Sequence, residues 1–316
     1  MNDKSTIKLP NGRVIRHRAD PLATMLAQYT VDESAILPPG DYDHKENAGT
    51  DLAHRPVDRS STVPDTRALD GKSVLVLGAG AVGGYVCRSL AALACLTLHL
   101  VDFDIVDVKH TRAGRTIYLP SQVSQKKVVA AKDLIERDHP DSRVIPYPFN
   151  VMDLPDIELV RLARRSAVTI NAIDDATAMW RVNALLYSLV EVLYVALHRG
   201  AESAHVIVTV PYATACLRCA LELDGPEQIQ TLHGEPGLGL DIQNAANWCA
   251  TLACELMYAK ATGHPIRRWD LTKNIFFFAN KSQPLSPDGP GVRMQQAHRR
   301  PGCPVCSTAG ANGNVV

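Results

Sequence analysis

The middle of the chain alternates short apolar runs with longer stretches whose apolar positions recur at helical spacing. Residues 73–77 form an apolar run that ends in glycines, and a stretch of helix length follows at 82–94. An apolar run bounded by turn residues is typical of a strand buried on both faces, as in a parallel sheet. The pattern predicts further strands at 97–101, 143–147 and 167–171, and further helices at 124–138 and 157–164.

This alternation of strands and helices predicts an α/β fold, a doubly wound and mostly parallel sheet. The alternation weakens after Leu193, where residues 206–210 and 275–278 have the pattern of strands and residues 241–262 that of one long helix. We expect this second half to continue the same sheet with antiparallel strands. The sequence therefore predicts one domain over residues 71–316.

Residues 1–70 have little regular pattern and are interrupted by turn-forming prolines and glycines. We expect an N-terminal arm or a small irregular extension, with one short helix at 22–29. The start of the chain has no apolar core of a signal peptide, and the longest apolar run, 184–197, is broken by Ser188 and Glu191 and is too short to span a bilayer. We therefore expect a cytoplasmic protein that does not enter a membrane.

The charge of the chain is balanced, with 33 Lys and Arg residues against 33 Asp and Glu residues. Proteins that bind nucleic acid or acidic membranes through a broad surface carry a clear excess of positive charge. We therefore expect neither nucleic acid nor membrane as a partner.

A glycine-rich loop follows the first predicted strand. Gly78, Gly80 and Gly83 form a G-x-G-x-x-G motif between strand and helix, and Asp102 lies at the end of the next strand. Such glycines allow a tight turn and let the backbone approach a phosphate at the helix N-terminus, and an acidic group in the position of Asp102 accepts hydrogen bonds from ribose. The motif predicts a nucleotide site, either for NAD or for ATP; alternatively, the glycines serve only close packing of helix on strand.

Charged residues follow the glycine loop in an order that points to ATP. They are Asp102 and Asp104, Arg112 and Arg115, Lys126 and Lys127, and then Asp174 and Asp175. This order resembles the ThiF/MoeB family of ubiquitin-activating-enzyme-like adenylyltransferases, and the resemblance extends over residues 70–308. It implies a Rossmann-like fold, a homodimer, and binding of ATP and Mg²⁺.

The resemblance also assigns roles to individual residues. Asp102 matches the ribose-binding aspartate, Lys127 a lysine that contacts phosphate, and Asp174 an aspartate that binds magnesium. Arg115 has the better spacing to Lys127, whereas Arg112 competes with it because the family's N-L-x-R-Q segment is not intact here. The family's N-terminal arginine, which reaches the neighbouring subunit, has no clear counterpart, although Arg59 and Arg67 lie in its region.

The residue types suit adenylation, in which a carboxylate attacks the α-phosphate of ATP. A carboxylate is already ionised near neutral pH, so the site must supply alignment and positive charge rather than a base. Lys127 and Arg115 are the candidates for the phosphates. In the alternative interpretation, Lys126, Lys127 and Lys132 form a solvated helix face, and the pair Asp174-Asp175 only caps the next helix.

The cysteines predict a structural metal site. Four of the eight form two C-x-x-C pairs, Cys216 with Cys219 and Cys303 with Cys306, and four thiolates suit tetrahedral Zn²⁺. Both pairs fall where the family has its zinc knuckles. A redox dithiol is the alternative, but it usually lies at a helix start beside a β-α-β pattern, and we expect neither pair to do so.

The remaining cysteines do not predict covalent catalysis. Cys87, Cys95, Cys249 and Cys254 are expected to be small buried residues on apolar helical faces. Relatives that carry the product onward as a thioester have a cysteine between the first knuckle and the long helix. Residues 221–240 contain none, and His233 in this segment is expected to be a loop residue.

The leading hypothesis is therefore adenylation of the C-terminal carboxylate of a ubiquitin-like or sulfur-carrier protein that ends in glycine. Adenylation of a short peptide in a peptide–nucleotide pathway is an alternative, because that mechanism also lacks the cysteine. A silent scaffold subunit of a heterodimeric activating enzyme is another, and an NAD-dependent oxidoreductase is the last, which leaves Asp174 and the cysteine pairs without a role.

Overall fold

The computed structural model describes residues 66–112, 114–228, 237–266, 269–282 and 289–307, with the Arg199 side chain left out. It also gives the backbone of two short strands, β1 (Thr6–Lys8) and β2 (Val14–Arg16), which pair with each other antiparallel. The helix expected at 22–29, Arg59 and His233 lie outside the described residues.

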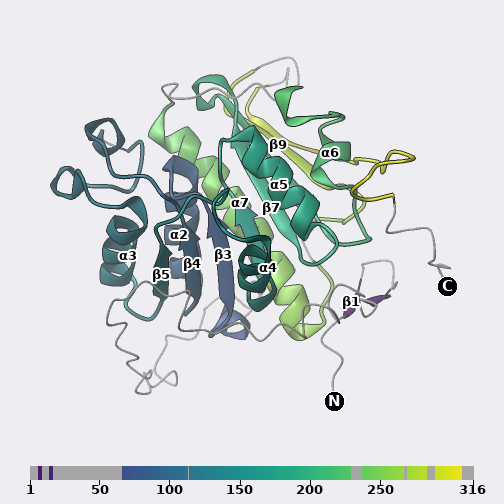
Figure 1. Cartoon of the computed structure of the whole chain (residues 1–316), viewed down its shortest axis with the longest axis horizontal. Coiled ribbons are helices and arrows are strands. Elements are labelled where there is room, and N and C mark those ends of the chain that lie inside the picture. The colour runs from purple at the N-terminus through teal and green to yellow at the C-terminus, as the bar shows by residue number, and fades with distance from the viewer. Residues whose placement is uncertain are drawn as a thin grey trace.

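The parallel part of the main sheet forms where the apolar runs predicted it. Its strands are β3 (Ser73–Leu77), β4 (Thr97–Val101), β5 (Arg143–Tyr147), β6 (Val168–Asn171) and β7 (Val192–Leu197). They lie in the order β5-β4-β3-β6-β7 (Figure 1). The chain thus turns to opposite sides of β3 to form β4 and β6, and such a switch point leaves a crevice at the carboxyl ends of the strands.

Antiparallel strands continue the sheet beyond β7. They are β8 (Ser203–Thr209), β9 (Ile275–Ala279) and β10 (Gly291–Gln295), so that one sheet has eight strands. The prediction of a mostly parallel sheet extended by antiparallel strands is confirmed.

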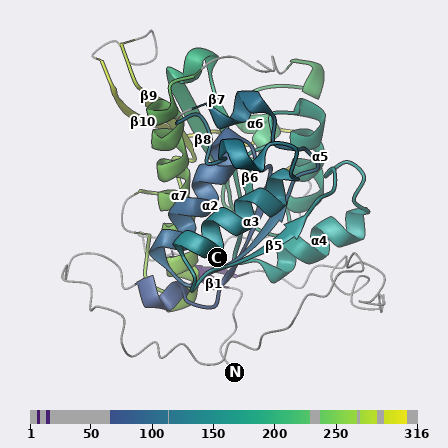
Figure 2. The same cartoon turned by 90° about the vertical axis from the view of Figure 1, so that its left-hand side faces the viewer.

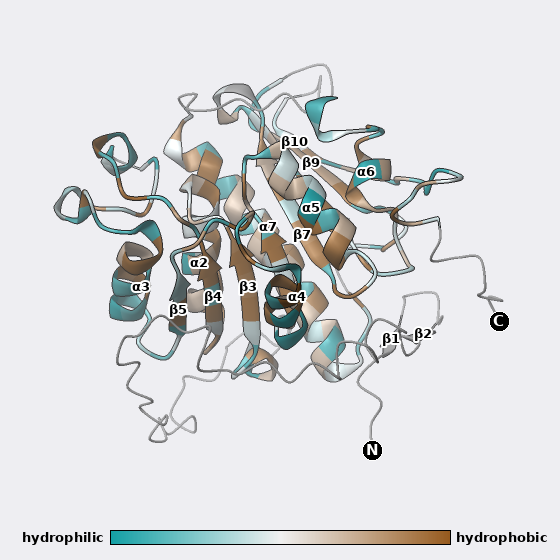
Figure 3. Cartoon of the chain, viewed as in Figure 1, coloured by the Kyte–Doolittle hydropathy of each residue, from teal (hydrophilic) through white to brown (hydrophobic). Residues whose placement is uncertain are grey.

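Helices cover both faces of this sheet (Figures 1 and 2). One face carries α2 (Ala81–Leu93), α3 (Lys127–Asp138) and α7 (Gly239–Thr262), and the other carries α4 (Asp156–Arg165) and α5 (Ala176–Leu186). Apolar residues concentrate on the strands and on the helix faces toward them, as the colouring of Figure 3 shows. Shorter helical pieces are α6 (Leu217–Ala220), η3 (Thr66–Leu69), η4 (Val108–Thr111), η5 (Pro120–Gln122), η6 (Arg199–Ala201) and η7 (Pro226–Gln228).

Several expected boundaries move by a few residues. The helix expected from 124 begins at Lys127, because Ser124 has a positive φ of 75° and Lys126 forms a β-bridge with Ile105. The strand expected at 206–210 is β8, and the helix expected at 241–262 begins two residues earlier. Within the described residues, no helix combines the length and apolar character needed to cross a bilayer.

Candidate nucleotide-binding site and metal centre

A cavity of about 710 Å³ lies at the carboxyl ends of the parallel strands. Because β3, β4, β6 and β7 all end at this edge, the loops that follow them form its walls. The predicted site residues that line it are Gly78, Gly80, Asp102, Asp104, Arg115, Lys127, Asp174 and Asp175. The structure therefore brings together residues that lie almost one hundred positions apart in the chain.

The three glycines of the loop have different surroundings. Gly78 has a positive φ of 96°, and a Cβ on it would lie 2.8 Å from the carbonyl oxygen of Ala172 after β6. A Cβ on Gly83 would lie 1.9 Å from the Gly78 carbonyl oxygen, so Gly83 allows α2 to approach β3 closely. Gly80 precedes α2, lines the cavity and would present a Cβ to open space. Close packing thus explains Gly78 and Gly83, whereas Gly80 borders the cavity and leaves open space beside its backbone.

Asp102 is tied to the glycine loop. One of its carboxylate oxygens accepts a hydrogen bond of 2.7 Å from the backbone N–H of Ala79, and the other accepts one of 2.8 Å from that of Asp104. Burial raises the pKa of the Asp102 carboxyl, while the nearby Lys127 and the two N–H donors oppose this rise. Each carboxylate oxygen has a second lone pair, so Asp102 retains the capacity to accept a bond from a ribose hydroxyl.

Lys127 is the buried cation of the cavity. Its side chain is only 7% exposed, and its ammonium lies 2.8 Å from the Asp104 carboxylate, which is 47% exposed. The Lys127 backbone N–H also donates to the Asp104 carbonyl, at 2.9 Å. The alternative of a solvated helix face is therefore wrong for Lys127, since its side chain points into the fold beside the cavity.

The loop after η4 brings one of the two competing arginines to the cavity. Arg115 lines it, whereas the described lining does not include Arg112, whose carbonyl accepts the Arg115 backbone N–H at 3.1 Å. The far end of this loop is fixed by Tyr118, which is buried and whose hydroxyl donates to the carbonyl of Ala79 in the glycine loop.

Asp174 and Asp175 follow β6 and differ in what they do. Asp175 is the N-cap of α5, since its side chain accepts a bond of 2.7 Å from the backbone N–H of Ala178. Asp174 is exposed and lines the cavity. The buried Asn171 side chain shapes the turn between them and β6 by accepting a bond from the Ile173 backbone N–H. The capping alternative therefore accounts for Asp175 but not for Asp174.

Other lining residues were not predicted from the sequence. The loop after β5 contributes residues 149–152, and β7 contributes its end, Val195 to His198. The His198 ring lies 3.1 Å, nitrogen to nitrogen, from the His205 ring on β8. No local motif marks these residues; only their position at the end of a parallel strand would have indicated them.

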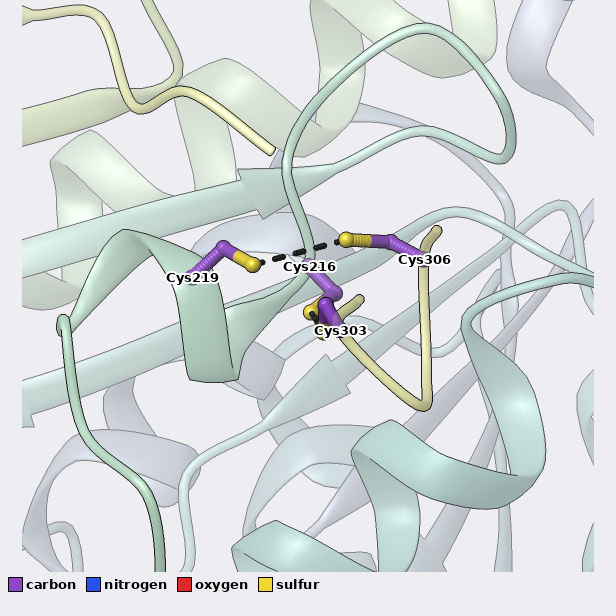
Figure 4. A group of neighbouring side chains, drawn as sticks. All are labelled: Cys216, Cys219, Cys303 and Cys306. Carbon is purple, nitrogen blue, oxygen red and sulfur yellow. Dashed lines mark hydrogen bonds between the residues drawn. The ribbon is translucent and has the colours of Figure 1, made fainter. Parts of the chain in front are cut away.

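The four cysteines of the two C-x-x-C pairs form one cluster, in which Cys216 and Cys219 at α6 face Cys303 and Cys306 from the C-terminal segment (Figure 4). All four sulfurs lie within 4.8 Å of one another, with 3.7 Å between Cys216 and Cys303 and 3.5 Å between Cys219 and Cys306. Four thiolates at about 2.3 Å from a tetrahedral Zn²⁺ would be about 3.8 Å apart. The donor type, number and spacing therefore fit a closed zinc site.

The surroundings of the cluster hold it in place. The Arg300 backbone N–H lies 3.3 Å from the Cys219 sulfur, and the Asn183 side chain accepts a bond from the Leu217 backbone N–H. Cys216 does lie at a helix start, as the N-cap of the four-residue α6, but this helix follows the antiparallel strand β8 and is not part of a β-α-β unit. The gathering of both pairs nevertheless favours a metal over a dithiol confined to one pair.

The remaining cysteines are placed much as expected. Cys87 in α2 and Cys249 in α7 are fully buried, and Cys254 lies in α7. Cys95 is an exception, because it follows the end of α2 instead of lying on a helical face. Burial raises the pKa of the Cys87 thiol to about 12, which keeps it protonated and unreactive near neutral pH.

Comparison with known proteins places the chain among relatives. The model of the ThiF family matches residues 57–305. Ubiquitin-like modifier-activating enzyme 5 of Caenorhabditis briggsae is 28% identical over 170 residues, which are 51% of this chain and 39% of that enzyme. The enzyme of the same name from Gallus gallus is 23% identical over 172 residues, 51% of this chain and 43% of that enzyme. The match thus spans less than half the length of these curated relatives.

Solved structures with a similar fold include Escherichia coli MccB with ATP. It has a TM-score of 0.58 and 17% identity, and the match covers 76% of this chain and 68% of that one. The Microcin C7 biosynthetic enzyme MccB in complex with N-formylated MccA has a TM-score of 0.58 and 16% identity, with 77% and 69% covered. At these identities the likeness concerns the fold.

Proposed function

The chain belongs to the ThiF family, and from this premise we propose that it is an ATP- and Mg²⁺-dependent adenylyltransferase. It activates the C-terminal carboxylate of a small ubiquitin-like or sulfur-carrier protein that ends in glycine. The observation that supports this most directly is that Gly80, Asp102, Lys127 and Asp174 all line one cavity at the switch point of the sheet. Assembly as a homodimer and a cytoplasmic location are parts of the same proposal.

In the reaction, a carboxylate oxygen of the substrate attacks the α-phosphorus of ATP. A new oxygen–phosphorus bond forms, the bond from the α-phosphorus to the bridging oxygen breaks, and pyrophosphate leaves. Asp102 accepts hydrogen bonds from the ribose, and Lys127 and Arg115 donate to the phosphate oxygens and stabilise the charge that develops there. The substrate carboxylate is already ionised near neutral pH, so the reaction needs no general base. The charged groups of the cavity then have only to bind and align the nucleotide.

The donor groups also fit the two metals. Asp174 offers an exposed carboxylate inside the cavity, the kind of ligand that Mg²⁺ takes together with phosphate oxygens and water. Bound there, Mg²⁺ would offset the negative charge of the departing pyrophosphate. Zn²⁺ would be held by Cys216, Cys219, Cys303 and Cys306, and would link α6 to a segment more than eighty residues further along the chain.

A short peptide is a second candidate substrate. Residues 221–240 contain no cysteine that would accept an activated acyl group as a thioester. The two thiols of α7 do not replace it, because burial raises the pKa of both Cys249 and Cys254, that of Cys254 to about 12. A reaction that ends with the nucleotide attached to its substrate needs no such cysteine.

The test is ATP–pyrophosphate exchange in the presence of Mg²⁺. The purified chain is combined either with small proteins ending in glycine or with short peptides, both taken from the reading frames next to its gene. Exchange that depends on one of these substrates and disappears in Asp174→Ala supports the proposal, and the class of the stimulating substrate decides between the two candidates. Failure of the chain to bind ATP in the presence of Mg²⁺ would contradict both.

A further inference from the structure

The first residue of helix α7 packs directly on the loop that carries Arg115. A Cβ on Gly239 would lie 1.8 Å from the carbonyl oxygen of Gly114 and 2.3 Å from its carbonyl carbon. These are backbone atoms, so no rotation of a side chain would relieve the overlap. Only a glycine lets the start of α7 and this loop approach so closely.

Gly114 is held from a second direction by Tyr85 of α2. The Tyr85 hydroxyl lies 2.8 Å from the carbonyl oxygen of Gly114 and 3.2 Å from the carbonyl oxygen of Thr116. Gly114 and Thr116 are the residues directly before and after Arg115. Tyr85 is buried, and its hydroxyl also interacts with the Gln243 side chain of α7. The backbone on both sides of Arg115 is therefore positioned by α2 and α7 together.

The same entry into α7 also borders the far end of the cavity. Gly237 lines the cavity, and a Cβ on it would lie 2.7 Å from the Cβ of Ala201, which lines the cavity after β7. Two residues further on, Gly239 meets the Arg115 loop. The start of α7 thus connects the part of the cavity beside β7 with the part that holds Arg115.

We infer that Gly239 is a positioning residue for Arg115, which sets through its contact with Gly114 where the guanidinium lies in the cavity. The inference rests on the proposed role of Arg115 at the phosphates of ATP. A guanidinium that donates to phosphate depends strongly on its placement, because hydrogen bonds between charged groups weaken steeply with distance and angle. Alanine at 239 would move the 114–116 backbone and withdraw Arg115 from the phosphates.

The experiment is calorimetric titration of the full chain with ATP in Mg²⁺ and, separately, with adenosine. Gly239→Ala, Arg115→Ala and the double variant are compared. We expect each single change to weaken ATP binding about tenfold, and the double variant to bind no more weakly than Arg115→Ala. Adenosine affinity should stay unchanged in all three, because adenosine lacks the phosphates.

Leu240→Ala is the matched control, since Leu240 is the next residue of the same helical turn and is 65% exposed. It should bind ATP as the unchanged chain does. Alanine is a better helix former than glycine, so a loss in Gly239→Ala does not come from a weaker helix. If Gly239→Ala does not fold, Tyr85→Phe is used in its place, because it removes the other contact to Gly114. Combined with Arg115→Ala, it should weaken ATP binding no further than Arg115→Ala does alone.

The outcomes separate this inference from the proposed function. Normal ATP binding by Gly239→Ala, additive losses in the double variant, or an equal loss of adenosine affinity would each overturn the inference and leave the proposed function standing. Normal ATP binding by Arg115→Ala would instead remove the proposed phosphate contact of Arg115, and the inference with it.

Discussion

The ammonium of Lys127 lies 2.8 Å from the carboxylate of Asp104, with the lysine side chain buried and the aspartate half exposed. The two residues come from the N-terminus of α3 and from the loop after β4, on neighbouring parts of the cavity wall. The Lys127 ammonium is therefore held at the cavity by a carboxylate that is itself in contact with solvent. Phosphate oxygens that enter the cavity would accept hydrogen bonds from this ammonium, either beside Asp104 or in its place.

Asp104→Asn tests how far Lys127 depends on its carboxylate. Without it the buried ammonium loses its direct ion-pair partner, and only the nearby Asp102 still offers negative charge. We expect the free energy of unfolding to fall by about 1–2 kcal/mol, a modest value because Asp104 is half exposed and Asp102 remains. Saturating ATP with Mg²⁺ should reduce this difference in stability between the variant and the unchanged chain, since phosphate then supplies negative charge to Lys127. Urea unfolding with and without ATP measures the difference under both conditions. Asp138→Asn, which disturbs exposed ion pairs with Arg137 and Arg88, should change stability by less than about 0.5 kcal/mol, and an equal loss in the two variants would contradict the prediction.

Asp174 and Asp175 provide a test in which neighbouring residues have opposite effects. Asp175→Ala removes the N-cap of α5 and should lower the free energy of unfolding by about 1 kcal/mol, whereas Asp175→Asn keeps a capping oxygen and most of the stability. Asp174→Asn should leave the melting temperature nearly unchanged but weaken ATP binding in Mg²⁺ by about tenfold or more. Thermal unfolding and calorimetry distinguish the two roles. Magnesium-dependent ATP binding that survives in Asp174→Asn would rule out the metal-holding role.

The cysteine cluster predicts one tightly bound zinc for each chain. Elemental analysis of the purified protein should find it, and Cys303→Ser should lower both the zinc content and the melting temperature, because metal binding is coupled to folding of the segments that supply the thiolates. Cys254→Ser is the control, since Cys254 lies outside the cluster. A full zinc content in Cys303→Ser would show that the metal is held elsewhere.

Much of the fold could be predicted because buried parallel strands leave a simple pattern. The strands β3, β4 and β5 begin and end at the predicted residues, since turn residues bound each apolar run on both sides. β7 was not separated from the apolar run before it, because the end of α5, the turn after it and β7 together form the mostly apolar run 184–197, which only Ser188 and Glu191 interrupt. β10 was not predicted, because only two apolar residues, Val292 and Met294, alternate with polar ones in its five-residue length, and every residue is exposed at the edge of the sheet.

The candidate site was predictable where a motif follows a strand, and, for Arg115 and Lys127, from the order of charged residues that resembles the ThiF/MoeB family. The glycine loop, Asp102 and Asp174 each come directly after a parallel strand, so the topology alone brings them to one edge. His198 was missed together with β7, the strand that it follows. The contact of Gly114 with Gly239 was missed for another reason: it joins two loops far apart in the chain, and nothing in either local sequence indicates the other.

Two histidines predict a loss of stability in mild acid. Burial is the main cause that lowers the pKa of His205 to about 3, with a contribution from His198, and burial with Arg165 and Arg143 lowers that of His99 to about 4. Both values lie below the ordinary value of 6.5. The unfolded chain therefore takes up protons that the folded chain does not, and stability that is complete above pH 6.5 falls as the pH drops toward 4 and 3.

His205→Gln should make this dependence on pH shallower. Between neutral pH and about pH 4.5, the variant should lose less free energy of unfolding than the unchanged chain, by roughly 1–2 kcal/mol. His264→Gln, a change at an exposed histidine, should reproduce the original pH dependence. Urea unfolding at the two pH values gives the comparison, and identical slopes for His205→Gln and the unchanged chain would contradict the assignment.

The central claim is that the cavity binds the triphosphate of ATP between Lys127 and Asp174, above the glycine loop. A crystal structure of the chain with ATP and Mg²⁺ tests it most directly. The account predicts the Lys127 ammonium within hydrogen-bonding distance of a phosphate oxygen and the Asp174 carboxylate at the magnesium ion or a water bound to it. A nucleotide whose phosphates lie elsewhere, with both side chains directed away from them, would contradict it.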